Sequence, residues 1–517
     1  MTPFNFTGGK VSSAAELARF ETEAARWKPK GLDQEFALRL DYYLHRQQHD
    51  VLAQIKVRYP KTWAEVATCM ETLPVTRFFV KELSKTFLNG AALHLVDDAS
   101  GESLEADDER ARAWAEAQEE TALALKLKQV DRYTTLMRTC FLVFDRAVGE
   151  ELTAQVYLPQ FVDVAFDDAH PFDLDMAWGV RLRIGGASPS ADGKERARFA
   201  FWCGRPEAPQ YRVLLSDGEV EPVPGNEAGA VPFTDAEGKP IVPVVMFTAH
   251  TEELGPFTDA HQGLHLFNRS IDVMITDVHH GGLAQYFGQL AITYPAGMEP
   301  SSQSTYEVGP TRALQLKDGA TATILSPSPQ IAQMVDLLDR DLKRQAMLHG
   351  LPPGSVSLEA RAVPSGVALQ IEMRPLMEER TDSVDVYRRP MARLWEVVQA
   401  VYDAREATPV FAGVCAKWQP GEIQMPESED QLIDRLLLLR RAGWIGDVAA
   451  VMRIFKVSEE QAERLLEEAK GEVPEVEPED PEKDGGDPPE ADAEDPPAAE
   501  PEPKDGPPET DEAPAPP

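Results

Sequence analysis

Two histidines four residues apart, His261 and His265, have the spacing of a helical metal site. Residues four apart share one face of a helix, and such a pair can bind zinc when a glutamate beside the first histidine serves as general base. Gln262 occupies the glutamate position here, and Gly263 weakens the helix that would present both imidazoles. We therefore predict that no metal is bound at this place.

A second stretch with possible chemistry is residues 7–12, Thr-Gly-Gly-Lys-Val-Ser. It superficially resembles a phosphate-binding loop, but it lacks the Gly-x-x-x-x-Gly-Lys-Ser/Thr spacing and no strand is predicted before it. A motor that hydrolyses nucleotide would need both features. Because no nucleotide loop, metal cluster or nucleophile motif stands out, we predict a protein that assembles rather than catalyses, without a cofactor.

Composition limits the class of protein. The chain has 517 residues, of which 43% are hydrophobic, so it can form about three domain-sized cores. Its four cysteines are scattered without the spacing of disulfides or zinc ligands, which indicates a reducing compartment. The first residues lack the features of a signal peptide, and no apolar stretch approaches the roughly 20 residues of a membrane helix. We expect no membrane partner.

The negative charge is concentrated at the C-terminal end. Residues 471–517 contain 18 acidic residues against Lys483 and Lys504, so they carry −16 of the net −36 and leave −20 for the rest. They also hold 14 of the 42 prolines. Such a segment cannot bury enough apolar surface to fold, and it is predicted to be disordered. It is either a solvating tail or an arm that engages a basic partner or repels DNA.

A helical stripe begins after Gly255-Pro256. Its apolar residues recur at alternating steps of four and three, as on one face of a helix: Ala260, Leu264, Phe267, Ile271, Met274 and Val278. Gly281-Gly282 predicts a break before a short continuation to Phe287. Strand-like residues 291–294 and 322–325 then frame a small β insert.

A second helix is predicted over residues 330–349, and Leu351-Pro352-Pro353-Gly354 ends it. After a loop, Ser365 can cap a third helix that reaches Asp403, although Pro375 and Pro390 must kink or divide it. Trp395 on this helix is predicted to lie in the core.

The remaining chain alternates between helical and β-rich regions. Helices are predicted before residue 138, and strands with a barrel or sandwich arrangement between 140 and 247. Short strands at 409–412 and 414–418 precede three helical stretches. The predicted ranges of the helices are 12–27, 32–57, 75–87, 107–137, 428–442, 445–454 and 458–470.

Several segments follow one another in a known order: a Val-Pro-Val-Val-Met-Phe strand at 242–247, a helix, a β insert, a returning helix ending in Leu-His-Gly-Leu-Pro, a loop with Pro364-Ser365-Gly366, and a long helix. In this order the chain resembles, over about residues 30–470, the portal proteins of tailed bacteriophages. These form the ring at the capsid vertex through which DNA is packaged.

The resemblance implies an α+β portal-like subunit with a wing of helices and β strands, a helical stem, a small β-containing clip, a helical crown and a disordered acidic, Pro-rich tail. It implies these segments: wing 1–255, with helical front 12–137 and β-rich part 140–250; stem helix 256–289; clip 290–329; second stem helix 330–350; tunnel loop 351–365; long kinked helix 366–404; short strands 405–427; crown 428–470; tail 471–517.

The same resemblance implies a function and partners. The protein would form a ring, most often of 12 subunits in that family, that conducts double-stranded DNA without reading its sequence. It would be assembled in the host cytoplasm and kept in the virion. Expected partners are the terminase, the major capsid and scaffolding proteins, and head-completion or adaptor proteins. Residues implied near DNA are Ser357, Glu359, Arg361 and Val363 of the tunnel loop and Arg340, Lys343 and Arg344 of the stem.

Charge favours a conduit over a protein that grips nucleic acid. Affinity for phosphates comes mostly from Lys and Arg, and the chain without its tail is still −20. An acidic wall with few basic residues would let a duplex slide. The alternative is another virion structural protein, such as a head-closure or tail component without a DNA channel; an enzyme is a more distant third.

Overall fold

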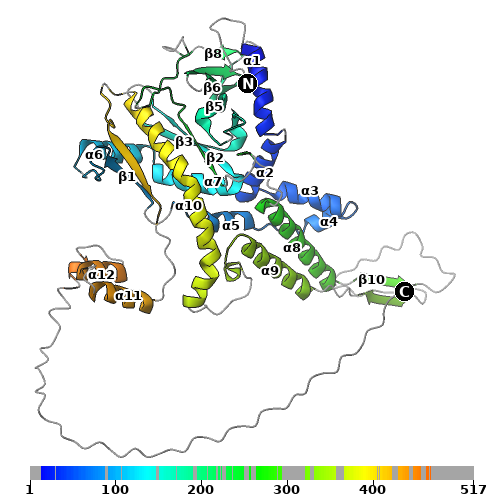
Figure 1. Cartoon of the computed structure of the whole chain (residues 1–517). Helices are drawn as coiled ribbons and strands as arrows, with labels where there is room; N and C mark the ends of the chain where they lie inside the picture. Colours follow the sequence, from blue (N-terminus) through cyan, green and yellow to red (C-terminus); the bar gives the residue numbers. More distant parts are fainter. Residues whose placement is uncertain are drawn as a thin grey trace, which may run out of the picture. The chain divides into compact units, whose positions relative to one another are not determined.

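The computed structural model describes residues 13–464 and 466, except residues 30, 88–90, 106, 147–150, 171, 190–194, 206–207, 217–218, 222, 224–228, 236, 250–254, 258–262, 288, 294–320, 326–330, 357–365, 405, 407, 422–428, 442–445 and 456–460. It divides into two units, Met1–Pro426 and Glu427–Pro517. The fold is α+β, as the sequence predicts (Figure 1). None of the described helices is long and apolar enough to cross a membrane.

The first part of the chain is helical, but its helices are shorter than predicted. The predicted helix over 32–57 is divided, because His45 has a φ of 60° and interrupts the ladder of hydrogen bonds. Ala122, with a φ of 48°, divides the predicted helix over 107–137 in the same way. The helices are α1 Ser13–Trp27, α2 Leu32–Tyr43, α3 Gln48–Arg58, α4 Trp63–Ala67, α5 Val75–Leu83, α6 Glu109–Glu120 and α7 Leu123–Met137.

Two antiparallel sheets follow. The three-stranded sheet has the order β3-β2-β9, and the five-stranded sheet is a meander. Phe141 and Met246 of the first share a hydrophobic core with Val180 and Trp202 of the second. The arrangement is thus sandwich-like, and the barrel alternative is wrong for the described strands. These are β2 Thr139–Asp145, β3 Thr153–Tyr157, β4 Val162–Ala165, β5 Gly179–Pro189, β6 Glu195–Arg205, β7 Ala208–Leu215, β8 Val220–Glu221 and β9 Val244–Thr248.

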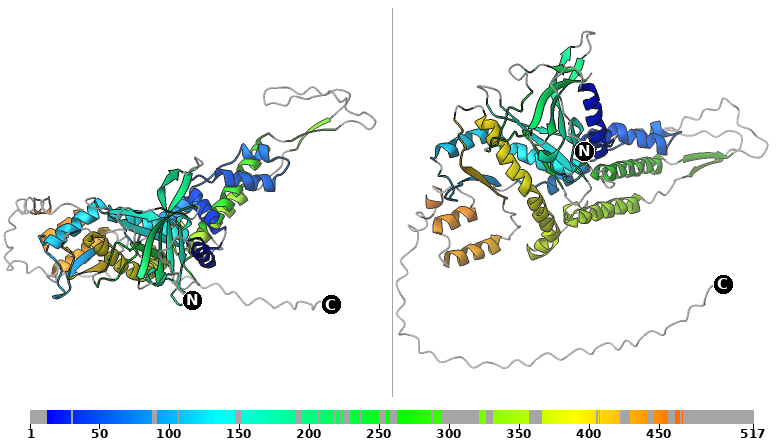
Figure 2. Two further views of the ribbon diagram at one scale, coloured as in Figure 1. Left: turned by 90° about the horizontal axis from the view of Figure 1, so that it is seen from above. Right: turned by 45° about the horizontal axis from the view of Figure 1, so that its top comes forward.

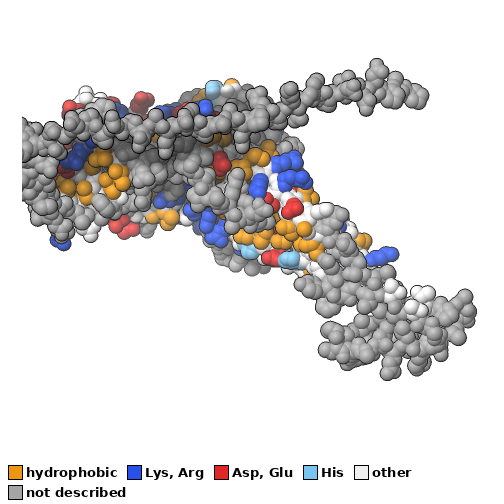
Figure 3. All heavy atoms as spheres, turned by 90° about the horizontal axis from the view of Figure 1, so that it is seen from below, with side chains coloured by type: hydrophobic (Ala, Val, Ile, Leu, Met, Phe, Trp, Pro, Cys, Tyr) orange, Lys and Arg blue, Asp and Glu red, His pale blue; other side chains and the backbone are white. Residues whose placement is uncertain are grey.

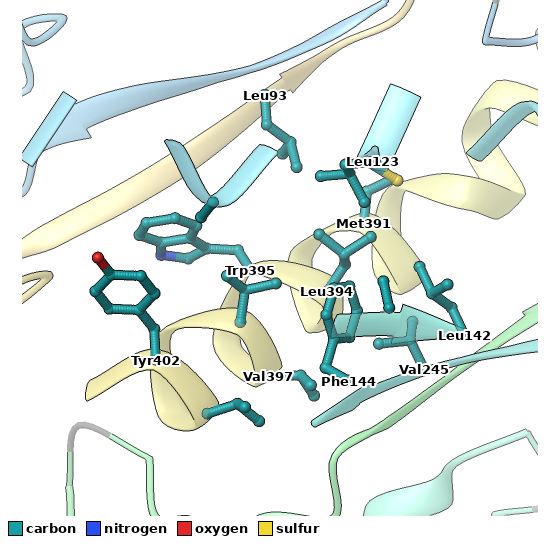
Figure 4. Packing of buried hydrophobic residues seen from close by; sticks show 14 of the residues in the cluster. Leu93, Leu123, Leu142, Phe144, Val245, Met391, Leu394, Trp395, Val397 and Tyr402 are labelled. Atoms are coloured by element: carbon teal, nitrogen blue, oxygen red, sulfur yellow. The ribbon is translucent and has the colours of Figure 1, made fainter. Parts of the chain in front are cut away.

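A third sheet joins two distant parts of the chain. β1 Ala92–Asp97 pairs antiparallel with β12 Val414–Gln419, with Leu95 opposite Ala416. The predicted strand at 414–418 is confirmed, the one at 409–412 is not formed, and β1 was not predicted. Beneath this sheet, Trp395 is buried in the largest core cluster, as the sequence predicts (Figure 4).

The paired helices are α8 Leu264–Phe287 and α9 Ile331–Leu348, which lie side by side (Figure 2). Between them, β10 Gln289–Thr293 and β11 Thr321–Leu325 form an antiparallel hairpin ladder. The helix predicted from residue 255 begins only at Leu264. The predicted break at Gly281-Gly282 is wrong, because a glycine costs a helix only about 1 kcal/mol and favourable context outweighs this.

The helix after the loop, α10 Gly366–Asp403, is continuous through Pro375 and Pro390. Of the two predicted outcomes, kinking or division, division is wrong, and Figure 1 shows α10 changing direction along its length. Buried Leu376 follows the first proline and buried Tyr387 and Met391 flank the second. Packing next to each proline therefore helps to hold the helix together where a backbone hydrogen bond is missing.

The second unit contains α11 Glu429–Arg441 and α12 Asp447–Phe455. These confirm the first two helices predicted after residue 427. Residues 461–464 are helical, and the remainder of the third predicted helix lies largely outside the described residues. The acidic segment 471–517 also lies outside them.

Candidate functional site

The interface between α8 and α9 is apolar. Ile271 of α8 is buried with Leu338 and Leu342 of α9, and Met274 and Val278 pack around them. These α8 residues belong to the stripe seen in the sequence, and the prediction that they share one face of a helix is confirmed for the described residues. The two helices therefore form one layer rather than separate arms.

A buried polar network holds α8 against the helical front. The carboxylate of Asp272 accepts hydrogen bonds from the Leu73 amide at 2.8 Å, the Gln47 side chain at 3.2 Å and the Asn268 side chain at 3.0 Å. The Asn268 side-chain oxygen accepts one from the Thr76 amide at 2.9 Å. Asp272 and Asn268 are both 0% exposed. Directional bonds of this kind fix both the rotation of α8 and its position along its axis.

His265 lies in the first turn of α8, and its contacts join this helix to α2. It is buried, and its Nε2 lies 2.8 Å from Oε1 of Glu35 on α2. The same carboxylate oxygen accepts a hydrogen bond from Nε of Arg39 at 3.3 Å. His261 lies outside the described residues, so the prediction that the two histidines bind no metal stays a prediction. Within the described part of the chain, no group of three or more His, Cys, Asp or Glu is arranged to hold a metal.

A second buried acid ties α10 to α7. Asp131 of α7 is 3% exposed and accepts hydrogen bonds from the Thr86 amide at 2.8 Å and the Tyr387 hydroxyl of α10 at 3.2 Å. Burial raises the pKa of Asp131 to about 6, although these hydrogen bonds and the charge of Arg380 act in the opposite direction. The folded protein therefore keeps a proton on Asp131 in a pH range where the unfolded chain has lost it.

Asp131→Asn should remove one component of the pH dependence of stability. Because the folded pKa is raised from 3.8 to about 6, the folded state binds the proton more tightly, and stability from this group falls as pH rises from about 4 to about 6. The wild type should lose about 3 kcal/mol relative to the variant in all, of which about 2 kcal/mol falls between pH 4 and pH 6. Urea unfolding of both proteins at several pH values measures the difference. Parallel curves would contradict the assignment.

The charged residues proposed for the stem lie on α9 and differ in their surroundings. Arg340 and Arg344 are exposed one helical turn apart, and neither has an ion-pair partner among the described residues. Lys343 pairs with Asp339 on the same helix. Figure 3 shows basic, acidic and hydrophobic side chains interspersed on the face seen from below, not one continuous basic surface. Two of these three stem cations are thus available for weak contacts with an anion.

The proposed tunnel-loop residues Ser357, Glu359, Arg361 and Val363 lie outside the described residues. The described start of this loop is fixed. Gly350 has a φ of 67°, and a Cβ at this position would lie 3.2 Å from the carbonyl carbon of Pro375 on α10. Leu351 after it is buried. The end of α9 and the first half of α10 therefore hold each other at the point where the loop begins.

Sequence reasoning missed the polar network. Asn268 and Asp272 are four residues apart, which is also the spacing of a solvated helix face. Their partners at residues 47, 73 and 76 lie about 200 residues earlier in the chain. The nearest signal in the sequence is that these two polar residues lie in a helix whose apolar residues are not confined to one side.

The comparisons with known proteins concern the fold alone. No family model and no curated protein matches the sequence. Among solved structures, the chain is similar to one in the neck of an empty GTA particle computed with C6 symmetry, with 15% identity and a TM-score of 0.38, covering 74% of this chain and 90% of the other.

Two further structures are similar to the same degree. One is the virion of a native gene transfer agent (GTA) particle, with 12% identity, a TM-score of 0.36, and coverage of 77% of this chain and 94% of the other. The second is the neck of a native GTA particle computed with C12 symmetry, with 14% identity, a TM-score of 0.35, and coverage of 76% and 89%.

Proposed function

We propose that this protein is a portal subunit that closes with identical copies into a ring around a DNA channel. The observation that carries the proposal is the order α8, β10–β11 ladder, α9, fixed loop start and α10, which is the order on which the resemblance to portal proteins was based. In this proposal α8 and α9 are the stem, the hairpin is the clip, and the helices and sheets before α8 are the wing. The second unit contributes the crown.

The charge distribution supports a conduit rather than a clamp. Arg340 and Arg344 would contact phosphates transiently, and Lys343, already paired with Asp339, would contribute less. Arg361 and Glu359 of the tunnel loop would act at the same channel. Because affinity for DNA grows with the number of neutralised phosphates, so few cations per subunit give weak, salt-sensitive contacts. A duplex can then move through the ring.

Partners follow from the same proposal. The ring would contact terminase during packaging, capsid and scaffolding proteins at the wing, and head-completion or adaptor proteins at the clip, and it would remain in the virion. It would catalyse nothing itself. The rival, a head-closure or tail component, shares the assembly but not the DNA channel.

The first test is the form of the purified full-length protein. We expect negative-stain images to show annular particles with a central hole, and native mass spectrometry to give a mass near 12 times the subunit's 57.1 kDa. A heterologous contact that closes on itself produces such rings. A protein that stays monomeric at all concentrations would refute the proposal, whereas rings that never bind or pass DNA would favour the rival.

A second test concerns the two exposed arginines. Arg340→Ala with Arg344→Ala should leave ring formation intact but weaken binding of random duplex DNA and flatten its salt dependence, because phosphate contacts are lost. Binding is measured between about 50 and 200 mM salt. The control is Lys239→Ala with Lys417→Ala, which removes the same charge from exposed positions on other elements. Equal effects of both pairs would show that only net charge matters.

A further inference from the structure

A cavity of about 300 Å³ lies where the end of α7, the start of α8 and the end of α9 meet α2 and α10. This volume is at the lower end of the range of ligand sites, so it suits a small ion better than a peptide or a base. The proposed function assigns no role to this cavity. Its polar and charged lining residues are Arg39, Asp131, Thr135, Arg138, His265, His349, Glu379, Ser383 and Tyr387.

Arg138, the residue that ends α7, has an unusual backbone conformation. Its φ of 72° lies in the left-handed region, which costs most residues other than glycine roughly 1–2 kcal/mol. Two hydrogen bonds hold it there: its own amide donates to the carbonyl of Thr134 at 2.8 Å, and the amide of Ala249 donates to its carbonyl at 2.9 Å. Glycine is the usual residue at such a helix end. The presence of an arginine therefore suggests a use for its side chain.

The guanidinium of Arg138 is half-buried and lines the cavity. Within the described part of the chain, it forms no hydrogen bond and no ion pair. Its charge acts inside the cavity, because the pKa of His349 is lowered by burial and, in addition, by the charge of Arg138. Charges that are withdrawn from solvent are normally paired. An anion is the partner that this guanidinium lacks.

The two acids in the cavity lining are not available for this role. Asp131 accepts hydrogen bonds from the Tyr387 hydroxyl at 3.2 Å and the Thr86 amide at 2.8 Å, and Arg380 adds a positive charge nearby. Glu379 is exposed on α10. Because solvent and salt screen an exposed charge far more than a buried one, Glu379 does little to exclude an anion from the cavity.

A second arginine lines the same cavity from α2. Arg39 is 1% exposed, and its Nε donates to Oε1 of Glu35 at 3.3 Å. The same oxygen lies 2.8 Å from Nε2 of His265. One carboxylate thus faces a permanent cation and an imidazole that can become one. The side of the cavity formed by α2 and α8 therefore carries no excess of negative charge.

We propose that this cavity binds a small tetrahedral oxyanion, phosphate or sulfate, through the guanidinium of Arg138. The planar guanidinium offers parallel N–H donors that match two oxygens of such an ion. The bound ion would lie beside His349 and would connect the end of α7 to the end of α9, just before the loop that joins α9 to α10. This inference depends neither on ring formation nor on DNA.

The test is isothermal titration calorimetry of the full-length protein with sulfate, and separately with phosphate, at neutral pH. Sodium chloride keeps the ionic strength constant. We expect one saturable site per chain with a Kd on the order of 1 mM. Saturation distinguishes this site from the general effect of these salts, which acts through exclusion from the whole protein surface. Chloride titrated alone should give no saturable signal.

Variants then locate the binding. Arg138→Asn removes the guanidinium and keeps a residue that tolerates the left-handed conformation, and it should weaken sulfate binding at least tenfold. Arg138→Lys keeps the charge without the paired donors and should retain part of the affinity. Arg77→Gln, at an exposed position on α5 outside the lining, removes the same charge and is the matched control without effect.

Unfolding in urea without sulfate shows whether the variants are folded, and it separates binding from a purely structural role. A cation at the end of α7 can also stabilise that helix through its dipole, which would change stability but not the affinity for sulfate. The proposal is overturned if no titration saturates, if Arg138→Asn binds sulfate as tightly as the wild type, or if Arg77→Gln weakens binding to the same extent.

Discussion

Asp272→Ala will lower the free energy of unfolding by about 3 to 4 kcal/mol at neutral pH. The change leaves three donors without their acceptor: the Leu73 amide and the side chains of Gln47 and Asn268. Each buried unsatisfied group costs about 1 to 3 kcal/mol. Burial raises the pKa of Asp272 to about 6, so removing a carboxylate that is costly to bury offsets part of the loss. Urea unfolding measures the difference.

Two controls separate the hydrogen bonds from the charge. Asp272→Asn keeps the shape of the side chain and one acceptor oxygen, but its NH2 group then faces either the Leu73 amide or the donors of Gln47 and Asn268, so it should recover only part of the loss seen with alanine. Asp336→Ala removes an exposed acid from α9 and should change stability by less than about 0.5 kcal/mol. If asparagine were as stable as the wild type, one acceptor oxygen would be enough at this contact, and the assignment of three accepted hydrogen bonds would be wrong.

The same variant bears on assembly. Asp272 lies in the first half of α8 and fixes that helix against residues that precede α5. If α8 and α9 line a channel, a helix free to rotate or slide would disturb the contact between copies at every position in the ring. We therefore expect Asp272→Ala to reduce the fraction of annular particles in negative-stain images even at temperatures where the protein remains folded.

Local sequence patterns predicted the helices and strands better than they predicted which of these elements pack together. The stripe on α8 was correct from Leu264 to Val278, because a buried face against one neighbouring helix gives a simple period. The divisions at His45 and Ala122 were missed, since a left-handed residue other than glycine leaves no trace in hydropathy. The continuity at Gly281 was missed because propensity is weak beside tertiary context.

The polar contacts of the candidate site were beyond sequence reasoning for a different reason. Asn268 and Asp272 form their hydrogen bonds with residues 47, 73 and 76, and a single sequence carries no record of which distant amides they face.

β1 and β12 lie far apart in the sequence and pair with each other. The last expected result concerns Trp395, whose side chain donates a hydrogen bond to β12. Trp395→Ala should destabilise the first unit by about 3 to 5 kcal/mol, the usual cost of truncating a buried tryptophan. Trp395 is 5% exposed, and its ring meets Trp114 at 5.4 Å and Phe411 at 5.2 Å between centroids. Its Nε1 donates to the carbonyl of Val414 at 3.2 Å, so one side chain joins α6, α10 and the start of β12.

The position of the damage distinguishes this variant from a general loss of stability. Without Trp395, β12 loses both its packing and a hydrogen bond, so amide exchange should accelerate first in residues 92–97 and 414–419 and only later in the sheets of the sandwich. Trp63→Ala, which loses a partly exposed ring contacted by Lys56 at 4.6 Å, should cost less than about 1 kcal/mol. Uniform acceleration of exchange in the Trp395 variant would mean that β1 and β12 are held by other contacts. The strand pair would then be an integral part of the sandwich core, not an element joined to it through α10.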